Sequence, residues 1–338
     1  MLAATYESAG DSGVLEVREL QTPDPGPGEV RVRIAVSGVN PTDWKLRRRS
    51  APTNGMPAVP NQDGAGTIDA VGPGVDKTRL GERVWLLLAA HNNRWGTAAE
   101  YCVVPAERAI PLPDSASFEL GASLGVPALT AWHCLCIVGQ PAGLTVLAAG
   151  GAGAVGRATI ELARHLDAET VIATVSGPEK AAIAEAAGAD LAVNYRDSDA
   201  SEQIIDAAPT GVDRFVEVAL DQNLALDMRV AAPHAVITSY AADPDSVAEV
   251  PVRDLMAANI ALRFMLLYTI TPAELRRAID GVSAALKVGA LSTPPLHRYS
   301  LAQVAEAHDA VERGAVGKVL IEVDHEFDGN PVPTGRIA

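Results

Sequence analysis

The chain has 338 residues, of which 48% are hydrophobic and 20% charged, and its formal net charge is −15. A chain of this length and composition is globular, with room for two domains, and its negative charge argues against binding to nucleic acid or anionic membranes. Three cysteines are too few for a disulfide framework, and no signal peptide or membrane-spanning run is visible, so we expect a cytoplasmic protein.

The first third of the chain is predicted to be rich in β-strands. Residues 1–6 lead directly into a first strand, and residues 30–36 alternate apolar and polar side chains as a half-buried strand does. Further strands are expected at 64–71 and 83–88, and the Pro- and Gly-rich segment 23–28 predicts a turn.

From about residue 119 strands alternate with helices, which predicts an α/β fold with a doubly wound parallel sheet. The predicted strands are 144–149, 170–175, 191–194, 213–218, 234–239, 259–268 and 318–323. The predicted helices are 155–166, 178–187, 199–207, 222–231, 272–287 and 301–313. The tail after Asp324 is expected to be mobile.

A glycine-rich turn follows the strand at 144–149. Gly151, Gly153 and Gly156 form a G-x-G-x-x-G pattern, with Ala154 and Val155 opening the next helix. In a strand–turn–helix unit this pattern binds a dinucleotide. Gly151 is expected to take the tight turn, Gly153 to let the backbone approach the pyrophosphate, and Gly156 to let helix and strand pack closely.

The end of the strand at 170–175 predicts which dinucleotide is bound. NAD sites place an acidic residue there, to accept a hydrogen bond from the ribose 2′-hydroxyl. This chain has Ser176 and Gly177 instead, and Lys180 follows on the next helix. An uncharged strand end with a nearby cation suits a 2′-phosphate, so the predicted cofactor is NADPH.

Several short motifs occur in an order that resembles the medium-chain dehydrogenase/reductase superfamily, and within it the zinc-free quinone oxidoreductases of the zeta-crystallin type. Besides the glycine-rich turn, they are GVNPTDWK at 38–45, GPGV at 72–75, GERV at 81–84, AEY at 99–101, NYR at 194–196 and GK at 317–318. The resemblance implies a GroES-like catalytic domain built from residues 1–123 and 269–338, around a Rossmann NADP-binding domain at 124–268. It also implies a cofactor cleft between the domains and a homodimer formed through the outer strand at 259–268, an apolar edge that needs covering.

The residues at the zinc positions of this superfamily predict that no metal is bound. The zinc alcohol dehydrogenases carry a Cys where this chain has Asn40, Gly-His-Glu where it has residues 61–63 (Asn-Gln-Asp), and a later Cys near residues 125–127. Cys102 is expected in a strand. Cys134 and Cys136 are two apart on a predicted helix and therefore do not face one site.

The resemblance also implies roles for single residues. Asn40 would donate a hydrogen bond to the substrate carbonyl; alternatively, or in addition, it is a turn residue before Pro41. Thr130 would touch the nicotinamide ribose, with a helix-surface threonine as the alternative. The other implied cofactor contacts are Tyr195 beside Ser176 and Lys180 at the 2′-phosphate, Lys318 near the pyrophosphate, and Leu266 and Leu267 at the nicotinamide. Trp44, Gln62, Trp95 and Tyr240 would shape the substrate pocket.

The predicted function is zinc-independent hydride transfer from NADPH to a small quinone or α,β-unsaturated carbonyl, chemistry that needs mainly positioning and exclusion of side reactions. One alternative is an enoyl reductase of a polyketide, acyl or secondary-metabolite pathway. For it, Lys45 with residues 47–49 (Arg-Arg-Arg) would be the basic patch, although we interpret that segment as a solvated loop. A further alternative is a non-catalytic NADPH-binding protein.

Overall fold

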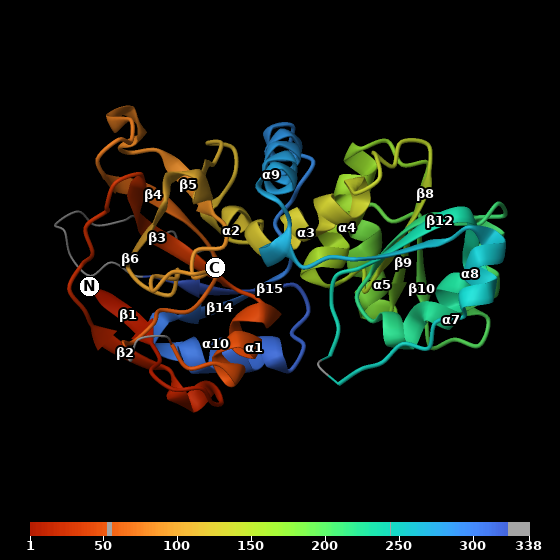
Figure 1. Ribbon diagram of the computed structural model, residues 1–338, viewed down its shortest axis with the longest axis horizontal. Helices are drawn as coiled ribbons and strands as arrows, with labels where there is room; N and C mark the ends of the chain where they lie inside the picture. The colour runs from red at the N-terminus through yellow and green to blue at the C-terminus, as the bar shows by residue number, and fades with distance from the viewer. Residues whose placement is uncertain (53–55, 244, 324–338) are drawn as a thin grey trace, which may run out of the picture.

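The computed structural model describes residues 1–52, 56–243 and 245–323. Figure 1 shows two lobes, a β-rich one on the left and one built on a parallel sheet on the right. Both ends of the described chain lie in the β-rich lobe, where the red N-terminal strands and the blue β14, β15 and α10 come together. In the part of the chain that the structure describes, no helix is long and apolar enough to cross a membrane.

The β-rich lobe contains a seven-stranded sheet in the order β14-β15-β3-β4-β5-β7, with β6 paired to β3. All pairs in it are antiparallel except β14 with β15. Its strands are β3 (Glu29–Val39), β4 (Asp63–Val71), β5 (Arg83–Leu86), β6 (Tyr101–Pro105), β7 (Ala109–Pro111), β14 (Leu296–Ser300) and β15 (Lys318–Glu322). Beside it lie the hairpin β1 (Leu2–Thr5) and β2 (Glu16–Glu19) and the helices α1 (Pro41–Arg49), α2 (Phe118–Gly121) and α10 (Val304–Glu312).

The alternation predicted for β3 is confirmed. Val30, Val32 and Ile34 are fully buried, whereas Arg33 between them is exposed. Successive side chains of a strand point to opposite faces of a sheet, so the apolar set is on the face that packs against the core.

The second sheet has six parallel strands in the order β10-β9-β8-β11-β12-β13. These are β8 (Thr145–Ala149), β9 (Thr170–Val175), β10 (Leu191–Asn194), β11 (Val212–Glu217), β12 (Ala231–Ser239) and β13 (Ala261–Phe264). The helices of this lobe are α4 (Ala154–His165), α5 (Pro178–Ala186), α6 (Ala200–Ala207), α7 (Leu220–Val230) and α8 (Val252–Ala258). Every residue of β8 is buried, as expected for a central parallel strand with both faces covered.

Two helices, α3 (Gly125–Cys136) and α9 (Pro272–Lys287), lie between the lobes (Figure 1). They pack against each other, and α3 also packs against α4. The contact is close at Gly281, where a Cβ atom would lie 1.9 Å from Nε1 of Trp132. The glycine therefore lets the two helices approach around the indole of Trp132.

The predictions for the outer strand and for the segment after Asn40 were wrong. The strand predicted at 259–268 covers only Ala261–Phe264, because the chain then leaves the sheet and enters a 3₁₀ turn at Leu267–Thr269. Lys45 and residues 47–49, interpreted as a solvated loop, lie on the helix α1, and the side chain of Arg47 is fully buried. Helix α8 and strand β14 were not predicted. The tail expected to be mobile after Asp324 lies outside the described residues.

Candidate active site

The glycine-rich turn joins β8 to α4, and three of its glycines are needed for different reasons. Gly150 adopts the left-handed conformation (φ 66°), so it takes the tight turn that we predicted for Gly151. Gly151 is instead required by packing, since a Cβ there would lie 2.6 Å from Cβ of Ala173. At Gly156 a Cβ would lie 2.3 Å from the carbonyl oxygen of Gly150, so only glycine lets α4 approach the turn.

The first turn of α4 presents the backbone amides that precede the first bond within a helix. Gly153 is its N-cap, and the first bond into the helix runs from the amide of Arg157 to the carbonyl of Gly153. The amides of Ala154, Val155 and Gly156 precede that bond, and such amides at a helix start attract anions. Gly153 also forms a parallel β-bridge with Gly317, which brings the start of β15 beside the glycine-rich turn.

The end of β9 brings together the residues predicted to hold the 2′-phosphate. The ammonium of Lys180 donates to Oγ of Ser176 at 2.9 Å, one helical turn apart in the sequence. The amide of Tyr195 donates to the carbonyl of Val175, and the Tyr195 side chain is 42% exposed. The guanidinium of Arg196 lies 5.7 Å from the Tyr195 ring centroid and adds a second cation, which our sequence reasoning missed although the residue follows Tyr195 directly.

A buried polar cluster formed by Asn40, Asp63 and Lys318 lies in the β-rich lobe. Nδ2 of Asn40 donates to Oδ2 of Asp63 at 2.7 Å, and Nζ of Lys318 donates to Oδ1 of Asn40 at 2.7 Å. The ammonium also forms an ion pair with Oδ2 of Asp63 at 3.1 Å. None of the three side chains is more than 2% exposed. We refer to these three residues as the Asn40 cluster.

Four elements fix the Asn40 cluster. Asn40 is the N-cap of α1, Asp63 begins β4 and Lys318 begins β15. The fourth element is α3, because the amide of Val126 in its first turn donates to Oδ1 of Asp63 at 2.8 Å. Asn40 is therefore both the residue before Pro41 that begins a helix and a member of a buried network, and its role as a donor to the substrate stays a prediction.

The side chain of Lys318, which we predicted to lie near the pyrophosphate, points into the Asn40 cluster. Its backbone neighbour Gly317 contacts the glycine-rich turn, but the ammonium turns away from solvent into the Asn40 cluster and is 1% exposed. Gly38 lines this position, because a Cβ there would lie 2.9 Å from Cε of Lys318.

A further buried carboxyl, Asp43, lies next to the Asn40 cluster. Its oxygens accept the amides of Asn40, at 2.7 Å, and of Gln62, at 3.1 Å. Burial and the neighbouring carboxylate of Asp63 raise the pKa of Asp43 to about 8. The raised pKa thus belongs to a carboxyl that is bonded directly to the backbone of Asn40.

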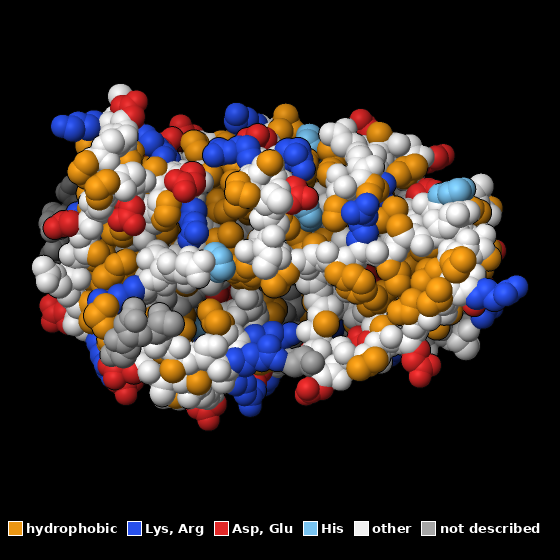
Figure 2. All heavy atoms as spheres, viewed as in Figure 1, with side chains coloured by type: hydrophobic (Ala, Val, Ile, Leu, Met, Phe, Trp, Pro, Cys, Tyr) orange, Lys and Arg blue, Asp and Glu red, His pale blue; other side chains and the backbone are white. Residues whose placement is uncertain are grey.

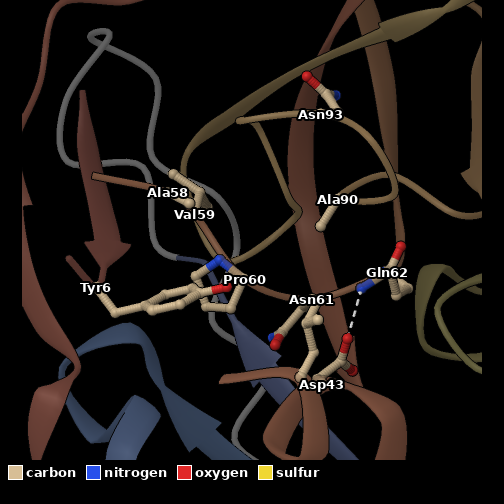
Figure 3. Close-up of a pocket in the computed structure, with 10 residues that line it drawn as sticks. Tyr6, Asp43, Ala58, Val59, Pro60, Asn61, Gln62, Ala90 and Asn93 are labelled. Carbon is tan, nitrogen blue, oxygen red and sulfur yellow. Dashed lines mark hydrogen bonds between the residues drawn. The ribbon is translucent and has the colours of Figure 1, made fainter. Parts of the chain in front are cut away.

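Two of the predicted substrate residues carry buried polar atoms that lack a partner among the described residues, namely Oε1 of Gln62 and Nε1 of Trp44. Gln62 and Asp43 line a small pocket together with Asn61, Asn93 and other residues, and Figure 3 shows the bond from the Gln62 amide to Asp43. Gln62 is thus the predicted substrate residue that lines this pocket, whereas Trp44 is not among its lining residues.

The remaining predicted residues lie at different places. Trp95 packs against the hydrophobic cores of the β-rich lobe, and Tyr240 packs against the central core at the end of β12. Thr130 is buried on α3, one turn after Val126. Leu267 is buried, whereas Leu266 is 53% exposed.

One residue that we did not single out, Tyr268, joins the two lobes. Its hydroxyl donates to Oγ1 of Thr42 on α1 at 3.0 Å, and its ring lies 5.1 Å from that of His91. The sequence offered one signal for this role, since Tyr268 carries the only hydroxyl in the otherwise apolar run 264–268.

Lys and Arg side chains gather over α1 in Figure 2. Arg48 pairs with Glu312, which Arg47 shares, and Lys45 pairs with Asp243. Two partner carboxylates thus face the four cations of this helix, so its positive charge is partly neutralised.

Comparisons with known proteins agree with this architecture. The alcohol dehydrogenase GroES-like domain matches residues 26–114, and the zinc-binding dehydrogenase family matches residues 154–284. Human quinone oxidoreductase is 27% identical over 330 residues, covering 95% of this chain and 97% of the relative. A solved mycobacterial quinone oxidoreductase is 30% identical with a TM-score of 0.82, covering 95% of this chain and 99% of that one.

A mycobacterial protein solved in complex with NADPH is 29% identical with a TM-score of 0.81, again covering 95% of this chain and 99% of that one. The similarity extends over both lobes and nearly the full length of each relative. The chain therefore belongs to the quinone oxidoreductase family of the medium-chain dehydrogenase/reductase superfamily, and it is an oxidoreductase of that type.

Proposed function

We propose that this enzyme transfers hydride from NADPH to a quinone or an α,β-unsaturated carbonyl without zinc. The observation that carries this proposal is the ammonium of Lys318, held between Asn40 and Asp63. Asn40 and residues 61–63 stand where the zinc relatives are expected to carry metal ligands. An internal cation already neutralises Asp63 and repels a divalent ion, and the amides of Asn40 and Gln62 are poor zinc ligands.

The cofactor assignment rests on the end of β9. Lys180 donates to Ser176 and Arg196 lies over the ring of Tyr195, and the strand ends in Ser176 and Gly177 where NAD sites carry the acidic residue that selects the 2′-hydroxyl. Ser176, Lys180 and Tyr195 would hold the 2′-phosphate, and the amides of Ala154, Val155 and Gly156 the pyrophosphate. The relative solved with NADPH supports this choice.

NADPH, when bound, supplies the hydride, which adds to an electrophilic carbon while the electron pair of the double bond moves onto oxygen. The residues of the chain would position the acceptor and stabilise that oxygen. Asn40 is the proposed donor to it, with Thr130 beside the nicotinamide ribose. Trp44 and Gln62 offer an unpaired donor and acceptor for the rest of the substrate. A proton from water completes the reduced product.

The test is the loss of NADPH absorbance with purified enzyme, against a panel of simple quinones and α,β-unsaturated carbonyls, with NADH alongside. We expect turnover with NADPH, little with NADH, and no change after chelation or added zinc. Faster turnover of acyl thioesters than of quinones would favour the enoyl reductase alternative. Tight NADPH binding without turnover on any acceptor would leave the non-catalytic alternative.

We also propose a cytoplasmic homodimer formed through β13. This strand is the edge of the parallel sheet, and Phe264 on it and Met256 on the preceding helix are 71% and 72% exposed. An uncovered edge strand with large apolar side chains favours pairing with a second copy. The domain limits, residues 1–123 and 269–338 around 124–268, are likewise proposed.

A further inference from the structure

We propose that Lys318 is a positioning residue that orients and polarises the Asn40 amide for the substrate, and that it does not bind the cofactor pyrophosphate. This inference rests on the proposed function, in which Asn40 donates to the acceptor oxygen. It is carried by three bonds of the Asn40 cluster: Lys318 to Asn40, Lys318 to Asp63 and Asn40 to Asp63.

The chemistry of the partners fixes which way the Asn40 amide faces. An ammonium group can only donate and an ionised carboxylate can only accept. Oδ1 of Asn40 must therefore face Lys318, and Nδ2 must face Asp63. Asp63 alone would still hold Nδ2, so Lys318 adds a second restraint on this orientation and supplies the only positive charge on the carbonyl side among the bonds of the cluster.

The same bonds prepare Asn40 as a donor. The Nδ2 atom carries two hydrogens, and within the described ranges only the bond to Asp63 uses one of them. The positive charge on the carbonyl side of the amide draws electron density away from Nδ2, and hydrogen bonds in such a chain strengthen one another. The second N–H is thus a stronger donor to an oxygen that becomes negative as hydride arrives.

The ion pair with Asp63 separates this role from a pyrophosphate role, since burial does not distinguish Lys318, 1% exposed, from Asn40, 2% exposed. To reach a phosphate, the ammonium would have to leave Asp63 buried without its counter-ion, which is costly. The backbone of Gly317 already occupies the place beside the glycine-rich turn.

The experiment compares five variants of the full-length enzyme, the fifth being the triple variant N40A/K318M/D63N. K318M removes the ammonium while keeping much of the side-chain volume. K318M/D63N also removes the carboxylate, so that no unpaired charge is left buried and folding is protected. N40A removes the amide, and K287M is the control, because Lys287 is an exposed residue at the end of α9. Each is measured for kcat and KM with a quinone, for the Kd of NADPH alone, and for unfolding in urea.

We expect K318M and K318M/D63N to lose about tenfold in kcat, the size of one charge-assisted hydrogen bond, while the Kd of NADPH changes less than about threefold. We expect K318M/D63N to regain most of the stability lost in K318M but not its kcat. Adding K318M/D63N to N40A should cost no further kcat, because Lys318 acts through Asn40.

Two results would overturn the proposal. If K318M and K318M/D63N both lose about tenfold or more in NADPH affinity, Lys318 binds the cofactor. If K318M/D63N recovers both the kcat and the stability that K318M loses, the Asn40 cluster has only a structural role. If the wild-type enzyme turns over no acceptor, the proposed function fails separately, and the NADPH Kd of K318M still decides between the buried and the cofactor-binding assignments.

Discussion

The hydroxyl of Tyr268 donates a hydrogen bond to the hydroxyl of Thr42 across 226 positions of sequence, at 3.0 Å. Thr42 lies in the first turn of α1, two residues after Asn40, and Tyr268 lies in the segment that follows β13. The bond therefore ties the segment beside the parallel sheet to the helix that begins at the Asn40 cluster.

Removal of this bond should lower stability modestly. We expect Y268F and T42V each to reduce the free energy of unfolding by about 1 kcal/mol, the net contribution of one intramolecular hydrogen bond. The double variant should cost little more than either single one, since both remove the same bond. Urea unfolding of the three variants measures this, and fully additive losses would show that the two hydroxyls are not coupled.

Cofactor selectivity should depend on the cations at the end of β9. We expect K180M to weaken NADPH binding by about tenfold, and K180M/R196M by more, because each cation interacts with the 2′-phosphate. NADH binding should stay within about twofold, since NADH lacks that phosphate. Fluorescence titration with both cofactors tests the prediction, with K287M as the matched control. If NADPH and NADH lose affinity equally, Lys180 and Arg196 do not interact with the 2′-phosphate.

Stability should fall with rising pH because of a buried pair of carboxyl groups. Glu217, at the end of β11, and Asp227, on α7, are 0% and 1% exposed. Burial raises the pKa of both, and the charge of Glu217 raises that of Asp227 further. The folded state therefore binds more protons than the unfolded state above about pH 4, and stability is lost as pH rises from there through the raised pKa values.

The variant D227N removes the part of this linkage that comes from Asp227, because an amide stays neutral at every pH, and it leaves the raised pKa of Glu217 in place. We expect its Tm to match that of the wild type near pH 5 and to exceed it at pH 8. Thermal unfolding between pH 5 and pH 8 provides the measurement. A wild-type Tm that rises across this range, by more than that of D227N, would contradict the assignment.

The proposed dimer can be tested at β13. We expect F264D and M256D/F264D to shift the enzyme from dimer to monomer in sedimentation velocity, because a buried carboxylate at an apolar interface is strongly unfavourable. V288D serves as the control, since Val288 is 70% exposed but lies beyond α9, away from this edge. A wild-type monomer at micromolar concentration, or a dimer disrupted equally by V288D, would reject this interface.

Much of the fold was predictable because its signals are local. The alternation along β3, the glycine-rich turn after β8, and the pair Ser176 and Lys180 one helical turn apart each depend on residues close in sequence. The hydrophobic periods of strands (two residues) and helices (3.6 residues), and the residue types that a tight turn requires, can be recognised within about a dozen positions. The sequence by itself therefore determined the two sheet-forming regions and the NADPH preference that we propose.

Only the tertiary structure decided the arrangement around Asn40. Lys318 is 278 residues from Asn40, and Tyr268 is 226 from Thr42, so no periodic pattern connects either pair. The direction of the Lys318 side chain was decided by the cost of leaving Asp63 buried without a counter-ion. The end of β13 at Phe264 also depends on distant contacts, because the segment after it bonds to β12 and to α1. The apolar run 264–268 does not reveal these contacts.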